Sequence, residues 1–160
     1  MAQAEAGLLL QDLAGTHAFG ARLAATLEPG SVVLLEGDLG AGKSELARAT
    51  IRALAGSAIT VPSPTFTLVQ HYTLPSLLVG HADLYRLTDA SDVEELGLEE
   101  YWQSGALLVE WPDRAGGLWP NERLVIELTI TAAHSRRARL TGTGRWVGLL
   151  KSLATNDAAS

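Results

Sequence analysis

The sequence contains no cysteine and only two lysines in 160 residues. The absence of cysteine excludes disulfides, thiolate metal sites and cysteine nucleophiles. The four histidines have no close metal-ligand spacing, so a metal is expected only together with another ligand. The net charge of −6 argues against a chain that holds nucleic acid alone through a broad cationic face.

Long apolar runs are also missing. No stretch approaches the length of a membrane span, and the N-terminus lacks the basic region and the apolar core of a signal peptide. We therefore expect a cytoplasmic protein without membrane contact. With 47% hydrophobic content, residues 1–151 are expected to form one domain, followed by a disordered polar tail at residues 152–160.

One of the two lysines completes a phosphate-binding motif. The pattern G-x-x-x-x-G-K-[ST] is filled by Gly37, Gly42, Lys43 and Ser44. The glycines allow backbone N–H groups to surround an anion, the lysine reaches the terminal phosphates and the hydroxyl holds Mg²⁺. An apolar run at residues 32–35 leads in and a helix-forming run at residues 44–54 leads out, which places the phosphate at a helix N-terminus. A glycine-rich turn that merely connects has no use for Lys-Ser, so the motif predicts a nucleotide site.

Hydroxyl side chains occur on both sides of this loop. Before it, residues 8–13 are expected to form a short edge strand, and Thr16 is predicted to cap a helix that ends at residues 28–30.

After the helix expected at residues 44–54, residues 63–67 (Ser-Pro-Thr-Phe-Thr) combine a proline-fixed backbone with three hydroxyls, which can coordinate Mg²⁺ or orient water. This Ser-Pro-Thr segment is either a nucleotide-sensing switch or an ordinary turn that enters a strand.

A β-hairpin is predicted next, because residues 65–72 and 77–82 are both strand-like and a short proline-containing turn joins them. Asp83 follows the second strand, and a carboxylate in that place can orient water or bind Mg²⁺. The alternative is a salt bridge to Arg86 or a surface cap.

A buried central strand is predicted at residues 106–109, which are continuously apolar and end in Glu110. That is the layout of the second metal-binding element of P-loop enzymes, although a strand ending in a surface glutamate has the same sequence. We expect this strand and the strand at residues 32–35, which precedes the phosphate motif, to be parallel neighbours in the centre of the sheet. The hairpin is expected at an antiparallel edge. The fold class is therefore α/β: a single-domain P-loop NTPase in which a mixed central β-sheet is flanked by helices in three layers.

Two charged stretches have more than one interpretation. Residues 91–94 (Ser-Asp-Val-Glu) predict a capping box that opens a short helix closed by Gly97, within an acidic stretch at residues 89–102 that is either a solvated face or a docking surface. Residues 124–130 and 136–140 are predicted strands. The basic cluster consists of Arg136, Arg137, Arg139 and Arg145. It is either a charged strand face or a phosphate or RNA contact.

Five sequence elements together resemble the TsaE (YjeE) family, the small bacterial ATPases needed to make threonylcarbamoyladenosine in tRNA. They are GDLGAGKS (37–44), PSPTFTLVQHY (62–72), HADLYRL (81–87), EELGLEEYW (94–102) and LLVEWPDR (107–114). The resemblance covers roughly residues 7 to 145, and its DLYRL and LVEW elements are far more specific than the loop alone. It implies a P-loop ATPase domain that binds ATP and Mg²⁺.

The resemblance also assigns roles to residues. The nucleotide-binding residues that it implies are Thr16, Gly37, Asp38, Leu39, Gly40, Ala41, Gly42, Lys43, Ser44, Glu45 and Trp111. Ser44 and Glu110 would hold Mg²⁺, Asp83 would be the catalytic carboxylate, and Thr65 would belong to the switch and act in catalysis with them. The family's partners are the subunits TsaB and TsaD; such an ATPase binds them, resets the complex between turnovers and contacts tRNA indirectly or weakly.

A small-molecule kinase built on the same loop is the alternative function. Such kinases usually carry an arginine-rich lid over the phosphates, whereas the arginines here cluster near the C-terminus. A GTP switch is less compatible with the composition, because its guanine-binding N-K-x-D element needs a lysine and the sequence has none besides Lys43 and Lys151.

Overall fold

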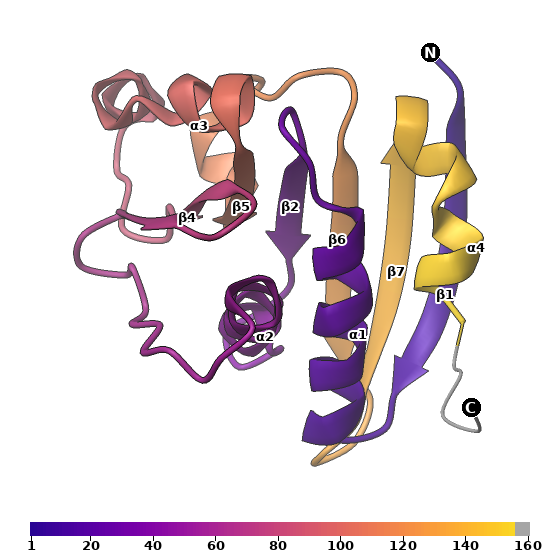
Figure 1. Ribbon diagram of the computed structural model, residues 1–160. Helices are drawn as coiled ribbons and strands as arrows, with labels where there is room; N and C mark the ends of the chain where they lie inside the picture. The colour runs from indigo at the N-terminus through magenta and orange to yellow at the C-terminus, as the bar shows by residue number, and fades with distance from the viewer. Residues whose placement is uncertain (156–160) are drawn as a thin grey trace.

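The computed structural model describes residues 1–155 and consists of three layers, with helices on both faces of a seven-stranded sheet (Figure 1). The strands are β1 (Gln3–Leu10), β2 (Val32–Glu36), β3 (Val69–Thr73), β4 (Leu78–Asp83), β5 (Ala106–Glu110), β6 (Leu124–Ile130) and β7 (Arg136–Thr143). The α-helices are α1 (Leu13–Thr26), α2 (Lys43–Ala55), α3 (Leu98–Ser104) and α4 (Leu150–Leu153). The 3₁₀ helices are η1 (Ala90–Leu96), η2 (Pro112–Ala115) and η3 (Gly144–Gly148).

The strand order β1-β7-β6-β2-β5-β4-β3 places the strand before the phosphate motif in the middle of the sheet. Strand β2 pairs in parallel with β5 and with β6, and β4 pairs in parallel with β5. The remaining pairs, β3 with β4, β6 with β7 and β1 with β7, are antiparallel. The α/β class and the mixed sheet are thus confirmed, with β2 and β5 parallel and central and the hairpin at one edge.

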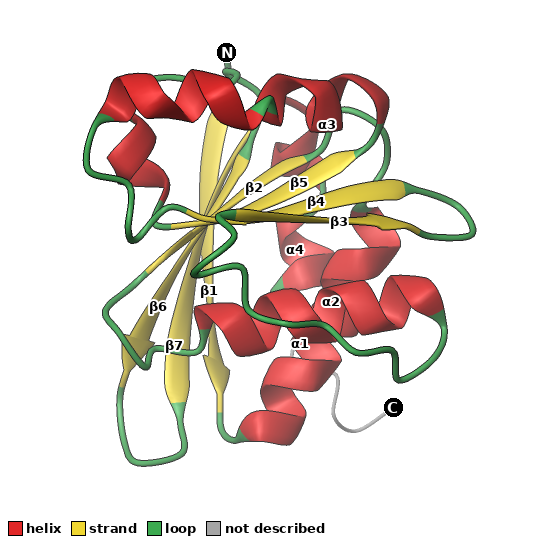
Figure 2. Ribbon diagram, turned by 90° about the vertical axis from the view of Figure 1, so that its left-hand side faces the viewer, coloured by secondary structure: helices red, strands yellow, loops and turns green. Residues whose placement is uncertain are grey.

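The central strands are buried on both faces, which explains their continuous apolar sequences. In β2, Val33 and Leu35 face the hydrophobic cluster beneath α1, α2 and α4, whereas Val32 and Leu34 face the cluster beneath η1, α3 and η2. Figure 2 shows the two helical layers on opposite sides of the twisted sheet. Helix α2 therefore covers one face of the strand that leads into it.

The N-terminal prediction needs two corrections. Strand β1 is an edge strand, as expected, but it spans Gln3–Leu10 instead of residues 8–13 because it pairs with β7 along its whole length. Thr16 is not the N-cap of α1: Asp12 is, and its carboxylate accepts a hydrogen bond of 2.8 Å from the Gly15 N–H. Aspartate caps at least as well as threonine, so the helix begins one turn earlier and Thr16 is buried within it.

Two further element starts differ from prediction. The hairpin's first strand begins at Val69, because residues 65–68 form a turn in which the Leu68 N–H donates to the Pro64 carbonyl at 2.6 Å. The capping box predicted at residues 91–94 is also wrong: Asp89 is the N-cap of η1 and accepts from the Ser91 N–H at 3.0 Å. Gly97 ends this helix with a φ of 64°, as predicted.

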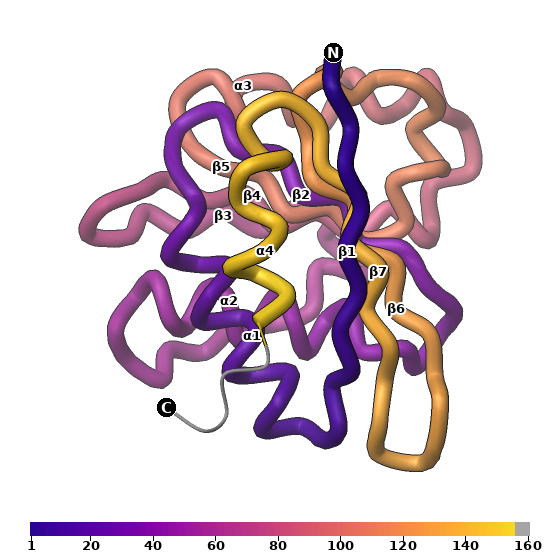
Figure 3. The backbone as a smooth tube through the Cα atoms, turned by 90° about the vertical axis from the view of Figure 1, so that its right-hand side faces the viewer, coloured from indigo at the N-terminus to yellow at the C-terminus, as the bar shows by residue number. Residues whose placement is uncertain are grey.

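The C-terminal part completes the edge of the sheet. Strand β6 has the predicted bounds, and β7 continues three residues beyond the predicted end at residue 140. Helix α4 lies beside β1 and α1 (Figure 3). It includes residues 152 and 153 of the predicted tail, while residues 156–160 of that tail lie outside the described residues. Within residues 1–155 no helix has the length and apolar character needed to cross a membrane.

Candidate functional site

The phosphate motif and both candidate carboxylates meet at one edge of the sheet. In the parallel register, Leu35 of β2 is the partner of Glu110, and Glu110 is the partner of Asp83 at the end of β4. Ligands of open α/β sheets bind outside the carboxyl ends of parallel strands, which is where all three strands end here. Three segments that are far apart in sequence therefore form one site.

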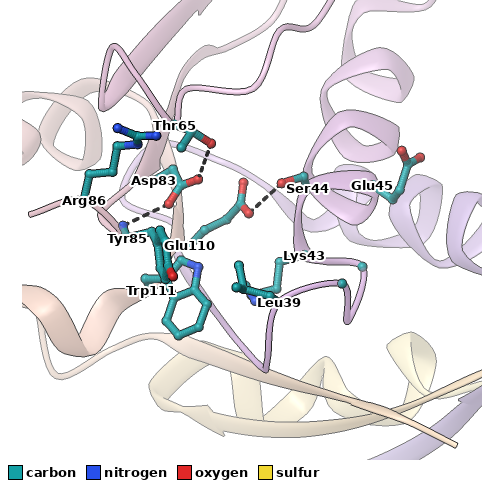
Figure 4. Close-up of a pocket in the computed structure, with 12 residues that line it drawn as sticks. Leu39, Lys43, Ser44, Glu45, Thr65, Asp83, Tyr85, Arg86, Glu110 and Trp111 are labelled. Atoms are coloured by element: carbon teal, nitrogen blue, oxygen red, sulfur yellow. Dashed lines mark hydrogen bonds between the residues drawn. The ribbon is translucent and has the colours of Figure 1, made fainter.

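A cavity of about 370 Å³ opens at this edge (Figure 4). Its lining residues are Leu39, Gly40, Gly42, Lys43, Ser44, Glu45, Thr65, Asp83, Tyr85, Arg86, Glu110 and Trp111. All except Tyr85 and Arg86 are site residues predicted from the sequence. Of the other predicted site residues, Gly37, Asp38 and Ala41 line a neighbouring cavity and Thr16 lines a third one.

Glycine is needed at both ends of the loop, for a different steric reason at each end. At Gly37 a Cβ atom would lie 2.5 Å from the carbonyl oxygen of Leu128, so a larger residue would push the loop off β6. Gly42 has a φ of 105° and precedes α2 without any side-chain cap. The first N–H groups of this 13-residue helix are therefore left for an anion in the cavity.

Lys43 is buried at the base of the loop. Its ammonium donates to the carbonyl oxygens of Gly37 and, at 2.9 Å, of Asp38, and it lies 4.3 Å from the centroid of the Trp111 ring. Burial lowers the pKa of Lys43, while the charges of Glu110, Asp83 and Asp38 oppose this shift. An entering phosphate would add negative charge beside the ammonium and favour its charged form.

Glu110 is 2% exposed, so the alternative of a surface glutamate at a strand end is excluded. Its Oε1 accepts a hydrogen bond of 2.7 Å from the Ser44 hydroxyl, and its Oε2 lies 2.8 Å from Nε2 of His81. The hydroxyl and the carboxylate come from the start of α2 and the end of β5, and both offer oxygen, the ligand atom that Mg²⁺ prefers. The pair therefore fits the cation that the motif implies.

Asp83 lies beside Glu110 and belongs to a different set of hydrogen bonds. Its Oδ2 accepts from the Thr65 hydroxyl at 2.9 Å and its Oδ1 accepts from the Tyr85 N–H at 3.0 Å. In the part of the chain that the structure describes, Asp83 makes no ion pair with Arg86, whose guanidinium stacks on the ring of Phe66 instead. The Ser-Pro-Thr segment thus contacts the second carboxylate directly.

Trp111 forms a wall of the cavity and has an unusual backbone. Its φ of 57° is left-handed, which is uncommon for a bulky residue and costs conformational energy. This turn directs the chain from β5 into η2 and places the indole 5.0 Å from the Tyr85 ring. Figure 4 shows the indole between Lys43 and Tyr85 on one side of the cavity.

The neighbouring cavity, of about 460 Å³, is larger but unsuited to phosphate. Glu36, Asp113 and Glu127 line it together with apolar side chains of β6. The pKa of Glu36 is raised by burial and by the charges of Glu127 and Asp113, and a phosphate would add to this repulsion. The anion site that the motif predicts therefore fits the cavity that contains Lys43 and Ser44 better.

Thr16 lies outside the main cavity, in a pocket of about 170 Å³ on the other side of the loop. Its lining residues are Asp12, Leu13, Thr16, Gly42, Glu45, Ala133, His134 and Arg136. Because Gly42 and Glu45 line both spaces, this pocket adjoins the main cavity. Arg136 supports the loop here, with Nε 3.1 Å from the Ala41 carbonyl and Nη2 3.1 Å from the Gly40 carbonyl.

Three residues near the site were not predicted from the sequence as site residues: His81, Tyr85 and Arg86. His81 had a signal, because strand alternation puts it on the same face of β4 as Asp83. Tyr85 and Arg86 come two and three residues after the end of that strand, within the DLYRL element. Arg136 was predicted only as part of the basic cluster, either a charged strand face or a phosphate or RNA contact. Its contacts with the loop carbonyls had no local signal, since those partners are 95 and 96 residues away.

Known proteins resemble this chain over most of its length. The family profile described as threonylcarbamoyl adenosine biosynthesis protein TsaE matches residues 10–139. The tRNA threonylcarbamoyladenosine biosynthesis protein TsaE of Rickettsia bellii is 37% identical over 126 residues, or 79% of this chain and 88% of that protein. The protein of the same name from Bacillus subtilis is 38% identical over 144 residues, or 89% of each. The crystal structure of B. subtilis YdiB has a TM-score of 0.80 and 30% identity, covering 98% of this chain and 99% of that one.

Proposed function

The chain belongs to the TsaE family of threonylcarbamoyl adenosine biosynthesis proteins, and on that premise we propose that it is an Mg²⁺-dependent ATPase acting in the synthesis of threonylcarbamoyladenosine in tRNA. The single observation that carries the ATPase assignment is the hydrogen bond of 2.7 Å between the Ser44 hydroxyl and the buried Glu110. It joins the phosphate motif to an acidic strand end, as expected for a site that holds a metal-bound nucleotide.

The phosphates of ATP would lie on the N-terminus of α2. The uncapped backbone N–H groups at the start of α2 would bind them, and Lys43 would exchange its bonds to loop carbonyls for bonds to phosphate oxygens. When bound, Mg²⁺ supplies charge that neutralises the phosphate oxygens as the bond to the terminal phosphate breaks. Ser44 and Glu110 are the residues proposed to hold it.

Asp83 is proposed to act on the attacking water. It is buried, it faces the cavity beside Glu110, and Thr65 and the Tyr85 N–H fix both of its oxygens. A carboxylate held in this way can orient water or accept its proton. Because Thr65 lies in the Ser-Pro-Thr segment, movement of that segment would change the position of Asp83 and hence the rate of hydrolysis.

The nucleoside is proposed to lie toward the pocket of Thr16. That pocket adjoins the phosphate site through Gly42 and Glu45, whereas Trp111 and Tyr85 cover the opposite side of the cavity where the terminal phosphate would react. Glu45 is fixed by hydrogen bonding to Arg48, which is the main cause of its lowered pKa. Thr16 and Glu45 both line this pocket and are the polar side chains proposed to contact the base.

TsaB- and TsaD-like subunits are the proposed partners. The TsaE relatives of this chain are named as proteins of threonylcarbamoyladenosine biosynthesis. The net charge of −6 disfavours independent capture of tRNA by this chain. The carbamoyl transfer is assigned to the TsaD-like partner. Hydrolysis of ATP by this chain would reset the partner complex after each transfer, with tRNA contacted indirectly or weakly.

Reconstitution tests this role. We expect TsaB and TsaD proteins, supplied with tRNA, ATP and an activated threonylcarbamoyl donor, to stop after a single turnover without this chain and to continue when it is added, because the reset requires its ATPase. Threonylcarbamoyladenosine in digested tRNA is quantified over time. Product formed by this chain alone, or a time course that its addition leaves unchanged, would contradict the accessory role.

A further inference from the structure

Glu110 has a second contact that the phosphate motif does not explain. Its Oε2 lies 2.8 Å from Nε2 of His81, a residue of β4 that is completely buried and does not line the cavity. His81 faces the same side of the sheet as Glu110, because its register partner is Leu108 and strand alternation brings Glu110 back to that side. The histidine therefore supports the carboxylate from within the protein, opposite Ser44.

The second ring nitrogen of His81 indicates that a histidine occupies this position because of its contact with Glu110. Nδ1 of His81 is buried without a hydrogen-bond partner among the described residues. An apolar side chain would fill this place between β3 and β5 without leaving a polar atom unsatisfied, so histidine is the more costly choice. The bond to Glu110 is satisfied by the tautomer that carries its proton on Nε2, which leaves Nδ1 as an unpaired acceptor.

The two hydrogen bonds of Glu110 divide its oxygens between two tasks. The His81 bond fixes Oε2 inside the protein, and Oε1 is left toward Ser44 and the cavity. A carboxylate with one fixed oxygen cannot rotate freely, so its free oxygen keeps one direction. Carboxylates that bind metals are commonly held in this way, and loss of the supporting group usually weakens metal binding about 10- to 100-fold.

We propose that His81 is the positioning residue of Glu110, and that it sets the Mg²⁺ requirement of nucleotide binding. This inference rests on the proposed Mg²⁺-dependent ATPase function. His81 does not touch the nucleotide or the cation; it acts through Glu110. Its contribution is therefore confined to the part of ATP affinity that depends on Mg²⁺.

The test compares His81→Gln with His81→Met. The amide nitrogen of glutamine is the same number of bonds from Cβ as Nε2 of histidine and can donate to Glu110, whereas methionine has similar length and no donor. ATP is titrated calorimetrically into each variant over a range of Mg²⁺ concentrations and in EDTA. In His81→Met the Mg²⁺ concentration for half-maximal ATP binding should rise about 10-fold or more, with affinity in EDTA unchanged. In His81→Gln it should stay within about threefold of wild type.

Thermal unfolding without ligand establishes that each variant is folded. If His81→Met does not fold, His81→Asn replaces it, because its shorter side chain cannot bring a donor to Glu110 and the same rise in Mg²⁺ requirement is expected. The proposal is overturned if the donor-lacking variant has the Mg²⁺ requirement of wild type, or if His81→Gln is impaired equally. A wild-type protein whose ATP binding is independent of Mg²⁺ would instead contradict the proposed function itself.

Discussion

Lys43→Ala is expected to reduce the affinity for ATP by about 10²-fold or more, because each hydrogen bond from a charged donor contributes about 1.5–3 kcal/mol and the ammonium can bond two phosphate oxygens. In the structure this ammonium is buried at the base of the loop, beside the N-terminus of α2. No second lysine is near it, since Lys151 lies in α4. Calorimetric titration with Mg²⁺ and ATP measures the effect.

The matched control is Lys151→Ala, which removes the same charge from an exposed position and should leave ATP affinity unchanged. Thermal unfolding of both variants separates a loss of binding from a loss of fold. Equal ATP affinity in Lys43→Ala and wild type would remove the premise that this loop binds phosphate.

Asp83→Asn is expected to slow hydrolysis by roughly 10²-fold while ATP affinity stays within a few-fold of wild type. Asparagine has the same shape and can still accept from the Tyr85 N–H, and the Thr65 hydroxyl can turn to accept from its amide. The site would therefore keep its geometry and lose only the negative charge that orients or deprotonates water. Single-turnover hydrolysis and ATP titration measure the two quantities separately.

Glu110→Gln is the partner variant, because it also replaces a carboxylate by an amide of equal shape at the adjacent strand end. Here the affinity itself should fall, by about 10-fold or more in Mg²⁺ but not in EDTA, as expected when a metal ligand loses its charge. If Asp83→Asn loses ATP binding and Glu110→Gln keeps it, the two roles are exchanged. If neither variant changes turnover, both residues are structural.

The local parts of this site could be predicted from the sequence, because each follows a pattern within a few residues. The glycines and Lys43 stand at fixed spacing between an apolar strand and a helix, and the structure has β2 and α2 at those positions. Glu110 was found in the same way, at the end of an apolar run that became the buried strand β5.

The contacts between distant segments could not be predicted. Arg136 reaches the loop carbonyls from 95 residues away, and His81 reaches Glu110 from 29 residues away, so both contacts depend on the order and register of the strands. The pairing of β1 with β7 has the same origin and made the first strand longer than its apolar run. A sequence pattern indicates where each strand lies in the chain, but not which other strands it pairs with in the sheet.

The predicted starts of two helices were wrong for a different reason, because nearby residues compete for the N-cap position. Asp12 precedes Thr16 by four residues and Asp89 precedes Ser91 by two, and in each case the aspartate caps the helix. Capping residues of this kind differ by only a few tenths of a kcal/mol in many contexts, so local contacts decide between them. The consequence for the site is that Thr16 is a buried residue in the first turn of α1, beside the loop.

ATP turnover with and without the partner subunits tests the central claim most directly. We expect slow release of phosphate by this chain alone, faster release when TsaB and TsaD proteins are both added, and no stimulated release by Lys43→Ala under the same conditions. Phosphate release is followed continuously at saturating Mg²⁺ and ATP, with the partners alone as the blank. Absence of turnover in every combination, or stimulated turnover that persists in Lys43→Ala, would contradict it.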